Sequence, residues 1–396
     1  MSLSAIIKGV SARKKFLLLG GLIFILILGL GVGGFRWWSH REFERFAQSI
    51  ENLSQKEMSV ILATDELEKE FKEEFDAIVF KETGNLANNK KHLTRTEEIH
   101  DEIYEKIEDE YLPLIDEKIA EINQFLDRRR YLWLWGDEKK FLDLVVSISE
   151  AAARAKTANA NVIEVDALLS PATFALQTDT LNYFGFLKTY GSVLPSAAMM
   201  TALAPFKKYT TGYKFPNEDS IKDNYLSFYK ALVNYRGLYG KIYEMYAAYT
   251  SGDYAKAERL AGEVAAISER DFGMTVDLEP INRPLFQGEL DAHVNALLAA
   301  NLYRESKLGE VSFGSRRLAA FALMWATELY ALDHDDKYPT ADAVTAAVGL
   351  LVDGKYLPAS FQFDQTTFSG TMGKDKYQIS FTDEVTGQEV SLFSTD

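Results

Sequence analysis

The most constraining feature of this sequence is an uninterrupted apolar segment near its N-terminus. Residues 16–35 hold twenty consecutive positions without a charged side chain. At a rise of about 1.5 Å per residue, a helix of this length spans about 30 Å, which is the thickness of the hydrocarbon core of a bilayer. The segment therefore predicts a transmembrane helix over 16–35, preceded by a short tail over 1–15.

The residues on either side of this segment predict its orientation. Residues 13–15 are all basic, whereas the following flank mixes arginines with Glu42 and Glu44. Because basic residues favour the cytoplasmic side, we expect the tail in the cytoplasm and the C-terminal domain in the periplasm or outside the cell. Trp37 and Trp38 follow the segment directly, where indole rings favour the headgroup region.

Two other interpretations of the apolar segment are weaker. A cleaved signal peptide has an apolar core of about 7 to 15 residues and a small-residue cleavage site, for which only the glycines within 31–34 are candidates. A buried core helix would carry a polar stripe, which this segment lacks. We therefore expect a single-pass anchor in contact with membrane lipid. Its glycines suit close helix packing, so a homo-oligomer stays an open alternative.

Charge and cysteine content exclude several classes of partner and site. The chain carries a net charge of −15, and residues 1–36 hold five basic side chains and no acidic one, which leaves −20 for residues 37–396. Such an acidic domain argues against nucleic acid as a partner, because binding it requires basic residues. The absence of cysteine from the sequence excludes disulfides, thiolate zinc sites and cysteine nucleophiles.

Residues 36–135 are predicted to form a long antiparallel helical hairpin of the coiled-coil type. Apolar residues recur every three or four positions from Arg41 to about Phe80, and again from Ile99 to Leu126, which is the spacing of an amphipathic helix. The segment 84–89 is rich in asparagine and predicts the turn between them. Pro113 interrupts the second pattern and is expected to kink or split that helix.

A helical domain is expected over 136–310. Asp137 is a predicted N-cap, Ser170 and Pro171 repeat the signal for a helix start, and the segment 280–284 with its two prolines predicts a linker. The aromatic run at 131–135 is expected to bury a corner. The apolar stretch Tyr190–Phe215 could line a groove, although packing under a loop is the commoner use of such a stretch.

One segment of this domain resembles a tetratricopeptide-type helical hairpin. The run AAYTSGDYAKAERLAGEVAAI, within 240–270, has Ala248, Gly252, Tyr254 and Ala257 at the small and aromatic positions of that motif. Only one unit is visible, and a stable solenoid needs about three. The resemblance therefore implies a single hairpin with tetratricopeptide-like packing.

Residues 311–396 are expected to form a small α+β module. Helices are predicted over about 315–332 and 343–351, the second capped by Thr340 and ended by Gly354. Two alternating segments, 377–381 and 389–393, predict a β-hairpin.

This order resembles the globular part of type IV pilins and type II secretion pseudopilins. The residues that carry the resemblance are Leu329, Tyr330, Asp336, Tyr338, Pro339, Thr340, Leu351, Gly354, Tyr356 and Leu357. The apolar segment 16–35 lacks the glutamate of a pilin helix and lies far from this module in the chain. The resemblance therefore implies a borrowed fold, or a contact with pilus or secretion machinery.

No catalytic, cofactor-binding or metal-binding residue is predicted, and no cofactor. The sequence contains no nucleotide-binding or hydrolase motif outside the apolar segment, and its five histidines are scattered. Residues 333–336, Asp-His-Asp-Asp, are the one candidate cation loop, but a solvated turn is the commoner role. We therefore predict a non-enzymatic structural or assembly component of a cell-envelope complex that binds protein partners. The alternative is an extracytoplasmic ligand-binding or sensing module.

Overall fold

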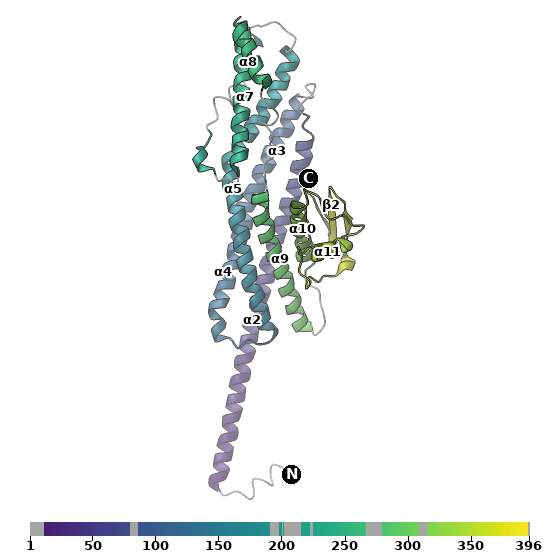
Figure 1. The fold of residues 1–396 in the computed structure, drawn as a ribbon. Helices are drawn as coiled ribbons and strands as arrows, with labels where there is room; N and C mark the ends of the chain where they lie inside the picture. The colour runs from purple at the N-terminus through teal and green to yellow at the C-terminus, as the bar shows by residue number, and fades with distance from the viewer. Residues whose placement is uncertain are drawn as a thin grey trace.

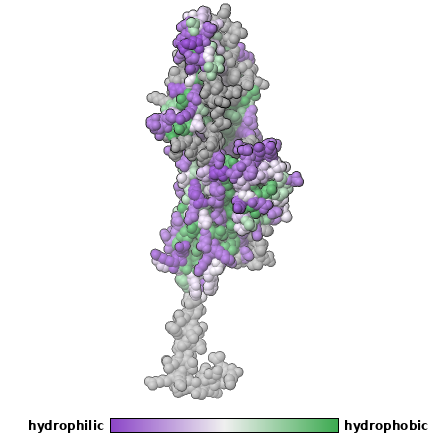
Figure 2. Space-filling view, viewed as in Figure 1, coloured by the Kyte–Doolittle hydropathy of each residue, from purple (hydrophilic) through white to green (hydrophobic). Residues whose placement is uncertain are grey.

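The computed structural model describes residues 12–79, 86–190, 198–199, 201, 215–221, 225–266, 279–308 and 315–394, and the side chains of 12–32 lie outside the described set. The described part is mainly helical, with one small antiparallel sheet near the C-terminus, which confirms the predicted fold class at this level. Figure 1 shows an elongated helical bundle that carries the sheet on one side. Hydrophilic side chains cover much of the face seen in Figure 2.

The longest helix, α2 (Ala12–Asp76), forms the axis of the molecule. Its N-terminal part projects alone from one end of the bundle, and the rest packs against α3 (Leu86–Lys106) and α4 (Leu112–Arg128) (Figure 1). Phe43, Phe46 and Ile50 of α2 are buried. Positions three or four apart lie on one face of a helix, so this spacing makes one side of α2 part of the core.

The predicted membrane segment at 16–35 lies mostly among residues whose side chains are outside the described set, and its backbone is the helical start of α2. Among the described residues, no helix is both long enough and apolar enough to cross a membrane. The membrane span accordingly stays a prediction. Most of Tyr190–Phe215 is also outside the described residues, although Met199 within it is buried.

Pro113 does not break the second half of the hairpin. A single π-helical turn, η2 (Ile107–Tyr111), continues α3 directly into α4, whose first turn contains the proline. A proline cannot donate the backbone hydrogen bond of a regular α-helix, and the change to a π-helical turn directly before it is the local adjustment with which the helical path continues. Ile115 and Ile122 remain fully buried beyond it.

The helix that starts at Asp137 continues through the second helix start predicted at Ser170. After a 3-10 turn, η3 (Arg129–Tyr131), the chain enters α5 (Asp137–Tyr190), and Pro171 lies inside this helix instead of starting a new one. The predicted break at Ser170 is therefore wrong. Leu169 and Ala172 beside the proline are buried, so tertiary packing on both sides of Pro171 outweighs the loss of one backbone hydrogen bond.

The predicted linker at 280–284 is also helical. It forms the start of α9 (Glu279–Leu308), with Pro284 inside the helix. The helices α9 and α5 lie against one another over much of their length. A Cβ atom on Gly288 would come within 2.9 Å of the backbone nitrogen of Ala155. The glycine thus permits a backbone approach that any side chain would prevent.

A helical hairpin forms the end of the body opposite the N-terminus (Figure 1). It consists of α7 (Leu226–Thr250) and α8 (Tyr254–Ala266), which are joined through residues 251–253. Gly252 in the connecting turn has φ of +83°, and the Asp253 carboxylate accepts a hydrogen bond from the backbone N–H of Lys256. A left-handed glycine followed by an N-cap aspartate is a typical link between two such helices. A 3-10 turn, η6 (Glu218–Ser220), precedes the hairpin.

The C-terminal module contains α10 (Arg316–Asp333), α11 (Val344–Asp353), a 3-10 turn η9 (Gln365–Thr367) and three strands. The strands β1 (Phe368–Met372), β2 (Tyr377–Thr382) and β3 (Glu389–Phe393) pair in sequence order, all antiparallel. Helix α10 contacts α9 on one side and β2 on another. Residues 318–323 of α10 are consequently all buried.

Two details of this module differ from prediction. No side chain caps α11, so Thr340 is not its N-cap, although Gly354 does follow its last residue. The strand β1 was not predicted, and its central Gly370 has φ of +135°, where a Cβ atom would lie 1.9 Å from the carbonyl oxygen of Gln378. A glycine in mid-strand breaks the alternation on which strand prediction depends.

Candidate functional site

Exposed aromatic side chains gather at the end of the bundle from which the start of α2 projects. They come from two segments that lie about a hundred residues apart in the sequence, one on α2 and one between α4 and α5. We call these six residues the aromatic collar: Phe35, Trp37, Trp38, Tyr131, Trp133 and Trp135, with exposed fractions between 40% and 61%.

The collar was not predicted as a unit. The sequence placed Trp37 and Trp38 at a membrane boundary, but it assigned the run 131–135 to a buried corner. That assignment is wrong for the aromatic side chains, because Leu134 is buried and the rings on either side of it are exposed. In YLWLW, aromatic residues alternate with leucines. An extended segment directs alternate side chains to opposite sides, so this alternation was the signal that the rings and the leucines face different ways.

Hydrogen bonds fasten the two halves of the collar together. Arg36 donates to the backbone oxygen of Trp133 at 2.7 Å and to the carboxylate of Glu138 at 2.8 Å. His40 Nδ1 lies 2.8 Å from the same Glu138 oxygen. Burial raises the pKa of Glu138, but hydrogen bonds from Arg36 and His40 outweigh that effect and hold it below its usual value. The base of α2 is thereby fixed to the start of α5.

Cationic side chains lie over the rings of the collar. The guanidinium carbons of Arg36, Arg41 and Arg130 lie 5.0, 5.2 and 4.7 Å from the ring centroids of Trp135, Trp37 and Tyr131, respectively. Such pairs are attracted through the ring quadrupole. Arginines beside exposed indole rings provide apolar surface and positive charge at one level of the molecule, which is the combination found at a membrane–water interface.

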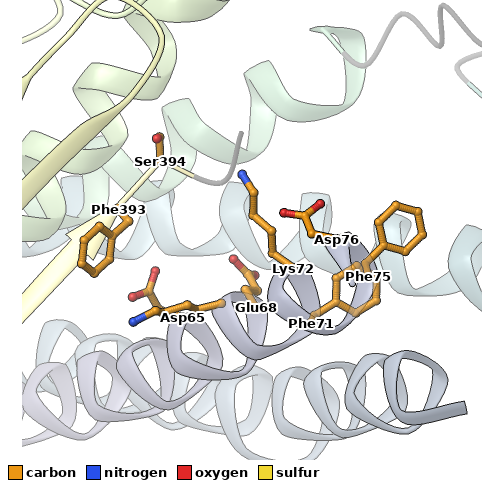
Figure 3. Close-up of a pocket in the computed structure, with 9 residues that line it drawn as sticks. Asp65, Glu68, Phe71, Lys72, Phe75, Asp76, Phe393 and Ser394 are labelled. Carbon is orange, nitrogen blue, oxygen red and sulfur yellow. The ribbon is translucent and has the colours of Figure 1, made fainter. Parts of the chain in front are cut away.

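A second feature is a cavity of about 430 Å³ between α2 and the end of β3 (Figure 3). Figure 3 shows Phe393 and Ser394 facing the side chains of α2 across this space. The ammonium of Lys69 lies 5.4 Å from the centroid of the Phe393 ring. The remaining lining residues are Asp65, Glu68, Phe71, Lys72, Phe75 and Asp76.

Two acids of this cavity have raised pKa values. Desolvation, with the charge of Glu66, raises the pKa of Asp65 to about 6. The side chain of Glu68 is exposed to the cavity, but protein atoms lie close around its carboxylate. Desolvation, together with the charges of Asp65 and Glu328, raises the pKa of Glu68 to about 7. Glu328 accepts a hydrogen bond from the hydroxyl of Tyr377 at 2.7 Å. Three carboxylates thus meet where the C-terminal module rests on α2.

A buried polar network lies deeper in the bundle. Lys118 pairs with Glu57, and Tyr111 donates a hydrogen bond to Glu289, which also accepts one from Asn159. Desolvation lowers the pKa of Lys118 to about 8 and raises that of Glu289. Four helices contribute to this network, and it has no counterpart in the sequence-based predictions, because separate polar positions on different helices carry no joint pattern.

The candidate cation loop at 333–336 does not gather ligands. Asp333 accepts hydrogen bonds from Arg283 and from the hydroxyl of Tyr356, and the His334 ring stacks on Tyr330 with centroids 3.8 Å apart. Among the described residues, no group of three or more His, Asp or Glu side chains is placed to hold a metal ion. The loop serves as a turn that is fixed by its aspartate.

No protein-family model, curated protein or solved structure matches this chain.

Proposed function

We propose that this chain is a single-pass, membrane-anchored structural component of a cell-envelope complex, with its helical body outside the cytoplasm. The observation that carries the proposal is the aromatic collar. It lies at the base of the body next to the predicted membrane segment, and it combines exposed indole rings with arginines. The continuous helix α2 joins this base to the rest of the body.

The pilin-like module supports an assembly role in this proposal. The order of helices followed by strands in this module is the feature on which the resemblance to type IV pilins and pseudopilins rests. The module sits on the side of the bundle (Figure 1). We therefore propose pilus or secretion machinery as the class of partner, with contact made through this module and the tetratricopeptide-like hairpin of α7 and α8.

The distribution of tryptophans provides a direct test of the collar. The chain has five tryptophans, and four of them, Trp37, Trp38, Trp133 and Trp135, belong to the collar, whereas Trp325 lies in the bundle. The full chain would be reconstituted into vesicles whose lipids carry bromine atoms near the headgroups. Strong quenching of the indole fluorescence is expected. A variant with the four collar tryptophans changed to Phe, which retains Trp325, serves as the control and should not be quenched.

Topology can be tested independently because the sequence has no cysteine. A single cysteine at Ser2 or at the exposed Val385 would be treated in intact cells with a membrane-impermeant maleimide. The proposal expects labelling of V385C and protection of S2C. Protection of both sites, or labelling of S2C alone, would contradict the proposed orientation. Crosslinking in cells followed by mass spectrometry would then identify the partner complex, and recovery of the chain alone would contradict the assembly role.

A further inference from the structure

A cavity of about 420 Å³ lies between the middle of α5 and its neighbours α3 and α9. Residues between 162 and 177 of α5 contribute one face of its wall, because positions three or four apart lie on the same side of a helix. The lining residues are Phe71, His100, Tyr104, Val162, Val165, Asp166, Leu169, Ser170, Thr173, Phe174, Gln177, Tyr225, Phe228, Asn282 and Leu285. Most of this wall is apolar or aromatic, which is typical of sites for small organic ligands.

The ionisable side chains of the wall pair with one another. His100 Nε2 lies 3.1 Å from a carboxylate oxygen of Asp166, and Tyr104 also hydrogen-bonds to Asp166. Desolvation lowers the pKa of His100, but its hydrogen bond to Asp166 outweighs this and raises it overall. Ring contacts with Tyr104 and Phe174 hold the imidazole in place. The Asp166 carboxylate is thus already occupied by His100 and Tyr104, so the wall favours an uncharged ligand.

One polar atom of the wall remains available. The Oε1 atom of Gln177 is buried and has no hydrogen-bond partner among the described residues. A buried acceptor without a donor is costly, so a ligand that supplies one donor gains affinity at this position. Charged donors such as ammonium groups are disfavoured, since the wall offers them no unpaired anion. A hydroxyl group satisfies both conditions.

The size of the cavity limits the ligand further. An engineered protein cavity of about 150 Å³ binds benzene, so a space of about 420 Å³ has room for an apolar body roughly three times as large. We propose that this cavity binds a neutral small molecule with an apolar body and a single hydroxyl group, which donates its hydrogen bond to Gln177 Oε1. A medium-chain alcohol has this chemistry and serves as the probe.

Photoaffinity labelling of the full chain in phosphatidylcholine nanodiscs tests the proposal. The probe is a dodecanol derivative with a diazirine in its chain, and mass spectrometry maps the labelled peptides. Saturable labelling of peptides from α3 and α5 is expected, and excess 1-dodecanol should suppress it. Labelling at 16–35 that rises without saturation reports only lipid partition. Absence of saturable labelling on α3 and α5 would overturn the proposal.

Two variants separate specific binding from adsorption. Val162→Phe places a ring in the cavity and should abolish the saturable labelling, whereas Ala167→Phe adds the same ring on the exposed side of α5 and should leave it unchanged. Equal labelling of both variants would overturn the proposal. Should Val162→Phe fail to fold, as judged by its thermal unfolding, Ser170→Phe fills the same cavity.

The hydroxyl contact has its own readout. In the wild-type chain, 1-dodecanol should compete with the probe about tenfold more strongly than dodecane does, because only the alcohol donates to Gln177. In Gln177→Leu the two competitors should become equal. A preference for the alcohol that persists in this variant would refute the assigned contact, and equal competition in the wild type would refute the hydroxyl requirement.

Discussion

Arg317 and Asp383 form a buried ion pair in which the guanidinium donates one hydrogen bond to each carboxylate oxygen, both at 2.5 Å. Arg317 comes from the start of α10, and Asp383 from the turn after β2. The same guanidinium donates to the hydroxyl of Ser59 at 2.8 Å, and Ser59 belongs to α2. One side chain therefore connects the helix, the sheet and the long axis of the molecule.

Removing the carboxylate of this pair should be strongly destabilising. Asp383→Ala would leave the Arg317 charge buried without its partner, which typically costs about 3–5 kcal/mol. Thermal or urea unfolding of the purified chain would measure the loss. Asp116→Ala, which removes the partner of the more exposed Lys156, is the control and should cost less than about 1 kcal/mol. Equal losses in the two variants would contradict this assignment.

The acids beneath the module should make stability depend on pH. The pKa of Glu68 is about 7 in the folded chain against 4.5 as its ordinary value, so the folded state holds an extra proton between these values. The contribution of protonated Glu68 to the free energy of unfolding is complete below pH 4.5 and is lost as the pH rises through about 7.

Glu68→Gln imitates the protonated acid and should remove that loss. The difference in unfolding free energy between the variant and the wild type should be near zero at pH 4 and should favour the variant at pH 8. Urea titrations at both pH values would measure it. Glu73→Gln, at an exposed position of α2, is the control. Its difference from the wild type in unfolding free energy should be the same at pH 4 and pH 8. A difference of opposite sign at pH 8 would refute the proposed shift.

The contact between α5 and α9 should depend on Gly288. Gly288→Ala would force its new methyl group against the backbone of Ala155, and overpacking of this kind typically costs about 1–3 kcal/mol. Gly262→Ala on α8 meets no atom within 4 Å and should be stabilising by about 0.5–1 kcal/mol. Calorimetry of both variants would measure these changes in stability and show whether the contact between α5 and α9 is closely packed at Gly288. Destabilisation by Gly262→Ala would contradict the local geometry.

Two of the four collar tryptophans can be replaced without changing the core. Trp133→Ser combined with Trp135→Ser changes exposed side chains, so the unfolding free energy should stay within about 0.5 kcal/mol per site. Quenching of the remaining collar indoles by brominated lipid should persist, while the total quenched signal should drop by roughly half. Leu134→Ser is the contrasting variant, since it changes the buried residue between them and should destabilise the chain. An unchanged quenched signal in the double variant would place these rings away from the lipid.

Helical periodicity and local start signals predicted most of the described helices, because an amphipathic helix repeats its pattern over many turns. Asp137 and Ser315 marked helix starts that the structure contains. Prolines were misleading at Pro171 and Pro284, where packing between α5 and its neighbours maintains the helix. Such packing depends on residues far away in the sequence, and no local pattern records it.

The candidate sites were harder to predict than the helices. The collar brings Trp37 and Trp135 together across about a hundred residues, and the cavity beside Gln177 is lined by residues of five helices. Each residue has an ordinary role when considered alone. The relevant information is which positions meet, and that follows from the tertiary arrangement of the helices.

Because α2 is continuous, its length fixes the distance between the predicted membrane segment and the C-terminal module. Ser59, which holds Arg317, follows Phe35 by 24 positions, and a straight helix of that length rises about 36 Å. In the proposed membrane-anchored arrangement, the module therefore stands about 36 Å above the bilayer surface. Any membrane-embedded partner must extend a domain of that reach to touch the module, which favours large envelope assemblies over small integral proteins.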